Sequence, residues 1–119
     1  TCKDRISVYS GEDGISRSLI LAGAAGTISV TANVAPALMA QMCTAALAGD
    51  QHAAEAIDAK LAMLHADLFL EANPVPVKWA LYKMGLVGPK IRLPLVELDS
   101  QYQLQVCKAL AAAGIQLST

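Results

Sequence analysis

Two short β-branched runs, each followed by a helical pattern, constrain this 119-residue chain most strongly. The first run, over residues 6–9, precedes a helix that the segment Gly23–Gly26 ends. The second run, over 27–31, precedes a helix from about residue 35 to 48, for which Asn33 is the expected cap. Strand and helix in alternation predict parallel strands with crossover helices. Because two parallel strands leave both edges of a sheet open, the pattern predicts a piece of a larger α/β body.

The second half of the chain has a purely helical pattern, which predicts a domain boundary near residue 49. We therefore expect residues 1–49 to hold the two β/α units and residues 50–119 to hold three helices. The expected helices run from a cap at Asp50 to about Leu70, over residues 76–84, and from Asp99 or Ser100 to Gly114.

A proline-containing connection joins the first two of these helices. Residues 69–80 hold the only Phe, the only Trp and two of the five prolines. Pro74 and Pro76 alternate with other residues, which predicts an extended strut that opens into a helix, since proline is accepted in a first helical turn. Trp79 is the expected packing anchor of this connection.

The composition is apolar for a small domain, because 55% of the residues are hydrophobic and only 16% are charged. We expect faces that are covered by more chain or by another subunit; a helical bundle with many small surface alanines is the alternative. The net charge of −1 and the lack of a basic stripe exclude nucleic acid as a partner. No apolar run approaches the ~20 residues of a membrane-spanning helix.

Cysteine and histidine spacing does not indicate a metal or redox site. The three cysteines, Cys2, Cys43 and Cys107, are widely separated, and we expect free buried thiols in a reducing cytoplasm. His52 and His65 are thirteen positions apart without a third ligand nearby, so capping and surface roles are expected.

Four motifs resemble the dihydrodipicolinate synthase (4-hydroxy-tetrahydrodipicolinate synthase) family, and they follow its order and spacing. They are Ser10–Asp13, Gly26–Val34, Asn73–Ala80 and Ile91–Leu95. The resemblance covers the C-terminal part of that enzyme. It implies the last two β/α units of a TIM (β/α)8 barrel followed by a C-terminal three-helix domain.

The same resemblance implies a cytoplasmic, homotetrameric lyase of lysine and diaminopimelate biosynthesis. Such an enzyme condenses pyruvate with L-aspartate 4-semialdehyde through a Schiff base and needs no cofactor. Its Schiff-base lysine and its helper residues belong to the family's N-terminal barrel portion, before Thr1. We therefore expect no catalytic residue in this chain, and no activity from the chain alone.

Substrate-binding residues are expected where the two strands end. A glycine at a strand end, here Gly11, lets backbone approach a ligand closely. Glu12 and Asp13 are either a carboxylate pair for acid–base chemistry or acids at the start of a helix. The resemblance implies that Ile28 contributes to the pyruvate site and that Ser10, Gly11 and Glu12 line the pocket near the aldehyde. Glu12 stands where the family usually has Asp.

Two other functions remain open at this point. The chain is alternatively a portion of a sister pyruvate aldolase, such as N-acetylneuraminate lyase. Or it is a non-catalytic helical module that binds a partner through its alanine-rich faces.

Overall fold

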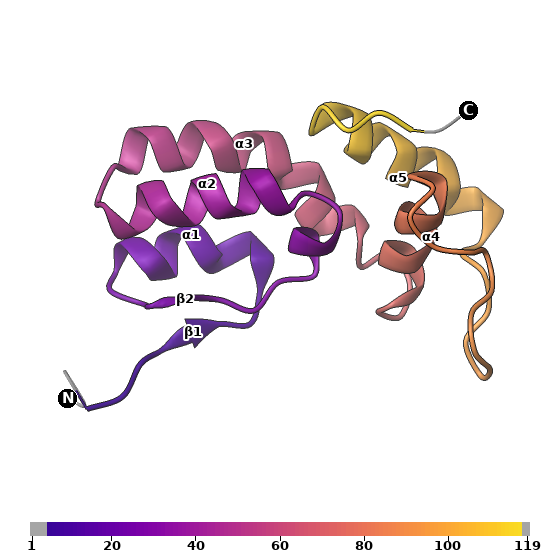
Figure 1. The fold of residues 1–119 in the computed structure, drawn as a ribbon, viewed down its shortest axis with the longest axis horizontal. Coiled ribbons are helices and arrows are strands. Elements are labelled where there is room, and N and C mark those ends of the chain that lie inside the picture. Colours follow the sequence, from indigo (N-terminus) through magenta and orange to yellow (C-terminus); the bar gives the residue numbers. More distant parts are fainter. Residues whose placement is uncertain (1–4, 118–119) are drawn as a thin grey trace.

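The computed structural model describes residues 5–117. Its elements alternate strand and helix in the first part and are helical after that (Figure 1). In chain order they are β1 Tyr9–Ser10, α1 Asp13–Leu21, β2 Gly26–Thr27, the 3₁₀ helix η1 Thr31–Asn33, α2 Pro36–Leu47, α3 Gln51–Asp67, α4 Val75–Lys83 and α5 Ser100–Ala112.

The two strands pair in parallel, as the sequence pattern predicts. Tyr9 lies opposite Gly26 and Ser10 lies opposite Thr27. The predicted extents, 6–9 and 27–31, are wrong in length, because each strand has only two residues and the second gives way to η1. Hydrogen bonds from Val30 and Thr31 to a side chain, described below, turn this backbone away from the sheet.

The residues that cap the helix N-termini agree with the predicted ones in two of three cases. The Asp50 carboxylate accepts from the Ala53 N–H at 3.0 Å, so the predicted cap of α3 is confirmed. Asp99 caps α5 in the same way by accepting from the Gln101 N–H at 3.0 Å. The predicted cap at Asn33 is wrong: α2 has Ala35 at its N-cap and Pro36 in its first turn, while the Asn33 amide donates to the Val30 carbonyl.

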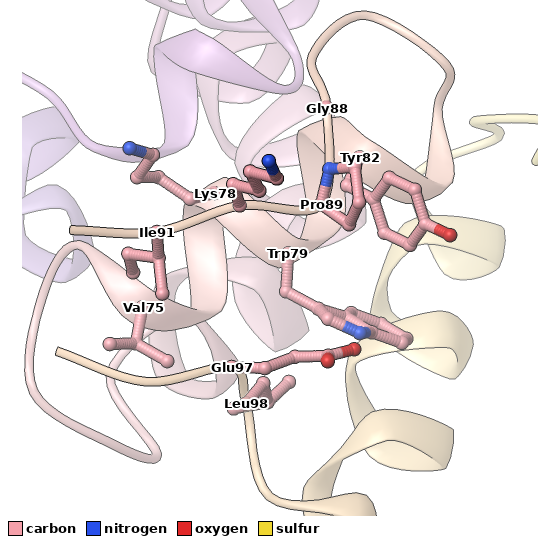
Figure 2. Close-up of a pocket in the computed structure, with 10 residues that line it drawn as sticks. Val75, Lys78, Trp79, Tyr82, Gly88, Pro89, Ile91, Glu97 and Leu98 are labelled. Atoms are coloured by element: carbon pink, nitrogen blue, oxygen red, sulfur yellow. The ribbon is translucent and has the colours of Figure 1, made fainter. Parts of the chain in front are cut away.

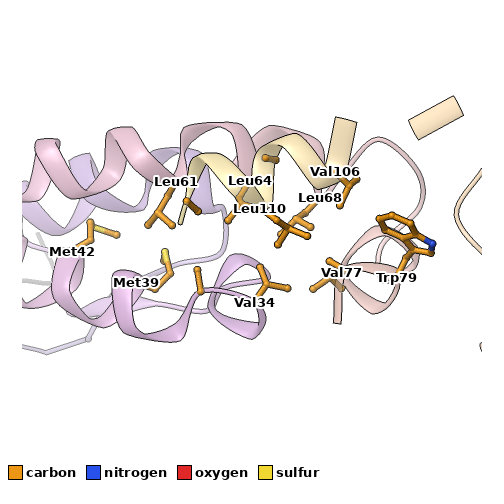
Figure 3. Close-up of a cluster of buried hydrophobic side chains, with 14 of the residues drawn as sticks. Val34, Met39, Met42, Leu61, Leu64, Leu68, Val77, Trp79, Val106 and Leu110 are labelled. Atoms are coloured by element: carbon orange, nitrogen blue, oxygen red, sulfur yellow. The ribbon is translucent and has the colours of Figure 1, made fainter. Parts of the chain in front are cut away.

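Helices α1, α2 and α3 lie side by side on one face of the strand pair, and α3 extends from this layer to α5 (Figure 1). The buried core follows the length of α3. Leu61 and Leu64 of this helix lie near Met39 and Met42 of α2 at one end and near Leu110 of α5 at the other (Figure 3). One apolar face therefore joins the β/α part to the helical part.

The proline-containing connection differs from the expected strut. Residues 68–74 form a series of turns, with a cis peptide bond between Asn73 and Pro74. Helix α4 then begins at Val75, with Pro76 in its first turn as predicted. Trp79 is buried in the core, which confirms its role as a packing anchor.

Large apolar side chains remain exposed on several elements, from β1 to α5. Tyr9 and Ile28 belong to the strand pair and its outgoing loop, and Leu93 and Val96 belong to the connection between α4 and α5. Within residues 5–117, no helix has the length and apolar character needed to cross a bilayer.

Helix α5 offers a matched test of the core. Leu110 is fully buried, whereas Leu104 on the same helix is 65% exposed. We predict that Leu110→Ala lowers the free energy of unfolding by about 2–5 kcal/mol, because it removes buried methyl groups and leaves a cavity. Leu104→Ala is the control and is expected to change it by less than about 0.5 kcal/mol. Urea unfolding measures both, and equal losses would contradict this assignment of the core.

Candidate functional site at the carboxyl ends of the strands

The carboxyl ends of β1 and β2 meet at one edge of the strand pair. The Ile28 N–H donates to the Ser10 carbonyl at 2.8 Å, so the loops that follow the two strands start side by side. All four residues predicted for substrate binding lie at this edge. Ser10 is buried, Gly11 and Glu12 are exposed, and the Ile28 side chain is 73% exposed. Their roles in substrate binding stay predictions.

Three hydroxyl groups fix the turn after β1. Ser16 Oγ lies 3.0 Å from Ser10 Oγ, 2.8 Å from Thr27 Oγ1 and 2.8 Å from the Glu12 carbonyl. Ser10 Oγ also donates to the Glu12 carbonyl at 3.0 Å and accepts from the Glu12 N–H at 3.2 Å. Because its hydroxyl is buried in this cluster, Ser10 shapes the loop that carries Gly11 and Glu12.

The two acidic residues at the start of α1 have different surroundings. Glu12 is the N-cap residue, yet its side chain makes no capping hydrogen bond and is exposed. Asp13 is only 3% exposed, and its carboxylate accepts from the Ser29 hydroxyl and from the Val30 and Thr31 N–H groups, both at 3.0 Å. Both acids therefore lie at the start of α1, as expected, but the Glu12 side chain makes no capping hydrogen bond and the Asp13 carboxylate bonds to residues 29–31 instead.

A second polar chain reaches the same loop from α3. Thr31 Oγ1 lies 2.9 Å from His65 Nδ1, and His65 Nε2 lies 2.9 Å from Asp58 Oδ1. Asp58 Oδ2 in turn accepts from Arg17 Nε of α1 at 3.0 Å. An ionised carboxylate can only accept hydrogen bonds, so His65 Nε2 carries a hydrogen and donates a hydrogen bond to Asp58.

The expected capping and surface roles are wrong for His65, because its side chain is only 6% exposed and links two elements. Asp58 and Ser16 also belong to these polar clusters, and neither is part of a prediction made from the sequence. The seven-residue spacing of Asp58 and His65 was the available signal, since it places both on one face of a helix.

Burial and charge shift two pKa values near this site. Burial alone would raise the pKa of Asp58, but hydrogen bonds from His65 and Arg17 and their positive charge outweigh it and lower this pKa. The pKa of the Cys43 thiol is raised by burial and by the negative charge of Asp13. Cys43 and Cys107 are free thiols, as predicted, but both are only half-buried; Cys2 lies outside the described residues.

An open cleft of about 620 Å³ lies between the loop after β1 and the end of α3. The segment Gly11–Gly14 forms one side, and Ala62, His65, Ala66 and Phe69 form the other. It thus includes two of the predicted binding residues, Gly11 and Glu12, but not Ser10 or Ile28.

A second cavity, beside Trp79, measures only about 10 Å³, which is room for at most one water molecule (Figure 2). Lys78 and Tyr82 of α4 and Glu97 of the following loop line it. Trp79 also has the Lys83 ammonium 5.9 Å above its ring. The cavity belongs to the packing of α4.

Across residues 5–117, no three His, Cys, Asp or Glu side chains are grouped so that they could hold a metal ion.

Comparison with known proteins assigns the chain to a family. Residues 1–113 match the family described as Dihydrodipicolinate synthetase. The chain belongs to this family. A 4-hydroxy-tetrahydrodipicolinate synthase from Alkalilimnicola ehrlichii is 60% identical over 113 residues, which cover 95% of this chain and 39% of that protein. One from Thioalkalivibrio sulfidiphilus is 57% identical over 117 residues, covering 98% of this chain and 40% of that protein.

Solved structures agree with this assignment. The chloride-inhibited dihydrodipicolinate synthase from Acinetobacter baumannii, complexed with pyruvate, is 50% identical and superposes with a TM-score of 0.91 over 93% of this chain and 38% of that one. The synthase from Aquifex aeolicus is 34% identical, with a TM-score of 0.92 over 98% of this chain and 40% of that one.

The chain spans about two fifths of the length of these dihydrodipicolinate synthases and matches their C-terminal part. The predicted resemblance to this family is therefore confirmed, and the fold is consistent with a portion of an α/β protein. The comparisons support this interpretation, and not the sister lyase or the helical interaction module.

The ion pair of Asp58 generates a pH prediction. Since the pKa of Asp58 is lowered on folding, its contribution to stability is present above about pH 4, the ordinary range of the group, and is lost as the pH falls through the lowered value. We expect the wild-type chain to exceed Asp58→Asn in unfolding free energy by roughly 1 kcal/mol at neutral pH, because the pair is partly screened by water. Urea unfolding between pH 7 and 3 should show the difference shrinking; a constant difference would contradict it.

Proposed function

We propose that this chain is the C-terminal portion of a cytoplasmic 4-hydroxy-tetrahydrodipicolinate synthase, a Schiff-base lyase that condenses pyruvate with L-aspartate 4-semialdehyde in lysine and diaminopimelate biosynthesis. In this proposal, residues 1–49 are the last two β/α units of a TIM barrel and residues 50–119 are the C-terminal helical domain. The observation that carries it is the family match over residues 1–113, together with a relative of this name that is 60% identical over 113 residues.

The geometry of the strand ends supports a binding role for this portion. Gly11 needs no special backbone conformation, and a Cβ added to it would meet no atom within 4 Å. Local packing thus does not require glycine there, and its missing side chain leaves the loop backbone open to a ligand. Glu12 makes no cap, so its carboxylate is available to the aldehyde substrate. The exposed Ile28 side chain is available to pyruvate.

The Schiff-base step itself requires a lysine amine. Such a lysine needs a desolvated pocket that lowers the pKa of its amine. Among residues 5–117, no lysine lines the cleft. We propose that the rest of the barrel supplies this amine, so the chain alone forms no Schiff base.

Self-association is also part of the proposal. The exposed apolar side chains Leu93 and Val96 would suit a contact between copies in a homotetramer. One relative, 35% identical with a TM-score of 0.90, is described as the first monomeric dihydrodipicolinate synthase variant. Because members of this family thus differ in oligomeric state, the oligomeric state is to be measured on the complete enzyme.

A chimera tests the activity. The N-terminal portion of the Alkalilimnicola ehrlichii relative is joined to this chain in place of its own C-terminal part. We expect the chimera to condense pyruvate with aspartate semialdehyde and to incorporate pyruvate covalently on borohydride reduction. We expect this chain alone to do neither, because the amine is missing.

The controls for the chimera are each portion alone and an assay for cleavage of N-acetylneuraminate. Circular dichroism establishes that the chimera is folded. A folded chimera without condensation activity, or one that cleaves N-acetylneuraminate instead, would overturn the proposal, as would turnover by this chain alone.

Gly11 allows a test of the binding edge within the same chimera. Gly11→Val places a side chain in open space, so we predict little change in melting temperature. Because the new side chain would block the aldehyde substrate, we predict that KM for aspartate semialdehyde rises about tenfold or more. Gly88→Val is the matched control, because a Cβ at Gly88 also meets no atom within 4 Å but lies in the distant loop after α4. Equal kinetics for both variants would remove Gly11 from the site.

A further inference from the structure

A buried carboxylate of α1 holds the loop that follows β2. Asp13 is 3% exposed, and three donors from Ser29, Val30 and Thr31 converge on its two oxygens. All three donors come from the loop that Ile28 opens, and none comes from α1 itself. Charge-assisted hydrogen bonds of this kind are about twice as strong as neutral ones.

This contact determines where the second loop lies relative to the first. Asp13 directly follows Gly11 and Glu12, so its carboxylate joins the two loops at the strand ends. Without it, the Val30 and Thr31 N–H groups would lose their partners, and Thr31 is fully buried. Leaving buried donors unpaired is costly, so the backbone of residues 28–31 would be expected to move.

The loop is held from its other side by α3. The Thr31 hydroxyl bonds to His65, while the Thr31 N–H bonds to Asp13. Ser29 Oγ, which donates to Asp13, also accepts from the Ala32 N–H at 2.9 Å. The N–H groups of residues 30–32 therefore each have a partner, and Asp13 accepts from two of them and from the Ser29 hydroxyl.

We propose that Asp13 is a positioning residue: by fixing residues 29–31 it holds Ile28 beside Gly11 and so sets the affinity of the site for the keto acid. It does not touch the substrate. The inference rests on the proposed function, which supplies pyruvate as the ligand.

The test uses the active chimera with Asp13→Asn. Hydrogen exchange followed by mass spectrometry reports the Val30 and Thr31 amides, and steady-state kinetics reports KM for pyruvate and kcat. We expect both amides to exchange about tenfold faster, as the loss of a charge-assisted bond implies, and KM for pyruvate to rise about tenfold with a smaller fall in kcat.

Asp67→Asn is the matched control. Asp67 is also buried, and its carboxylate accepts from Gln105 Nε2 at 2.8 Å, away from the strand ends. We expect this variant to lower thermal stability without changing the exchange of Val30 and Thr31 or the KM for pyruvate. A purely structural role for Asp13 would give the same result as Asp67→Asn and would overturn the inference.

Other outcomes are also decisive. The inference requires both faster amide exchange and a higher KM for pyruvate. Either change without the other therefore overturns it. If Asp13→Asn does not fold, Ser29→Ala removes one of the three donors and is expected to change both readouts less and in the same direction. An inactive wild-type chimera counts against the proposed function, while slow exchange of the two amides, accelerated in Asp13→Asn, would still show that Asp13 holds the loop.

Discussion

The apolar face of α3 is the contact on which the rest of the structure depends. This helix packs on α1 and α2 at one end and on α5 at the other, with Leu61 and Leu64 fully buried between them. Two strands of two residues each cannot hold a body together. The position of the strand pair is therefore maintained by the helices that pack on it. Because α1 and α2 are in turn packed on α3, this helix also fixes the edge where the predicted binding residues lie.

Side-chain hydrogen bonds then connect these helices to the loops after the two strands. His65 extends from α3 to Thr31, Asp58 links the same helix to Arg17 of α1, and Asp13 joins the two loops at the strand ends. In the described part of the chain, every buried side-chain nitrogen or oxygen atom has a hydrogen-bond partner. A fully satisfied network of this kind specifies one arrangement, since any rearrangement leaves a buried group unpaired. Gly11, Glu12 and Ile28, which are predicted to bind substrate, are the exposed residues of this edge.

Local signals predicted the elements well where the physics is local. Asp50 and Asp99 cap helices because a short carboxylate reaches the N–H groups of the next turn whatever surrounds it. Pro76 in a first turn and Trp79 as an anchor follow from similar short-range rules. The β-branched run 27–31 misled, because its strand propensity was outweighed by Asp13, which is distant in sequence and captures the Val30 and Thr31 amides.

By itself, the sequence determined the family, the alternation of strand and helix, and the four candidate binding residues, because motifs and periodicity are readable one segment at a time. Only the tertiary structure decided that Asp13 serves the neighbouring loop rather than its own helix, and that His65 is a buried link rather than a surface residue. Both outcomes depend on which donors and acceptors of separate segments meet, and that meeting is set by the packing of α1, α2 and α3.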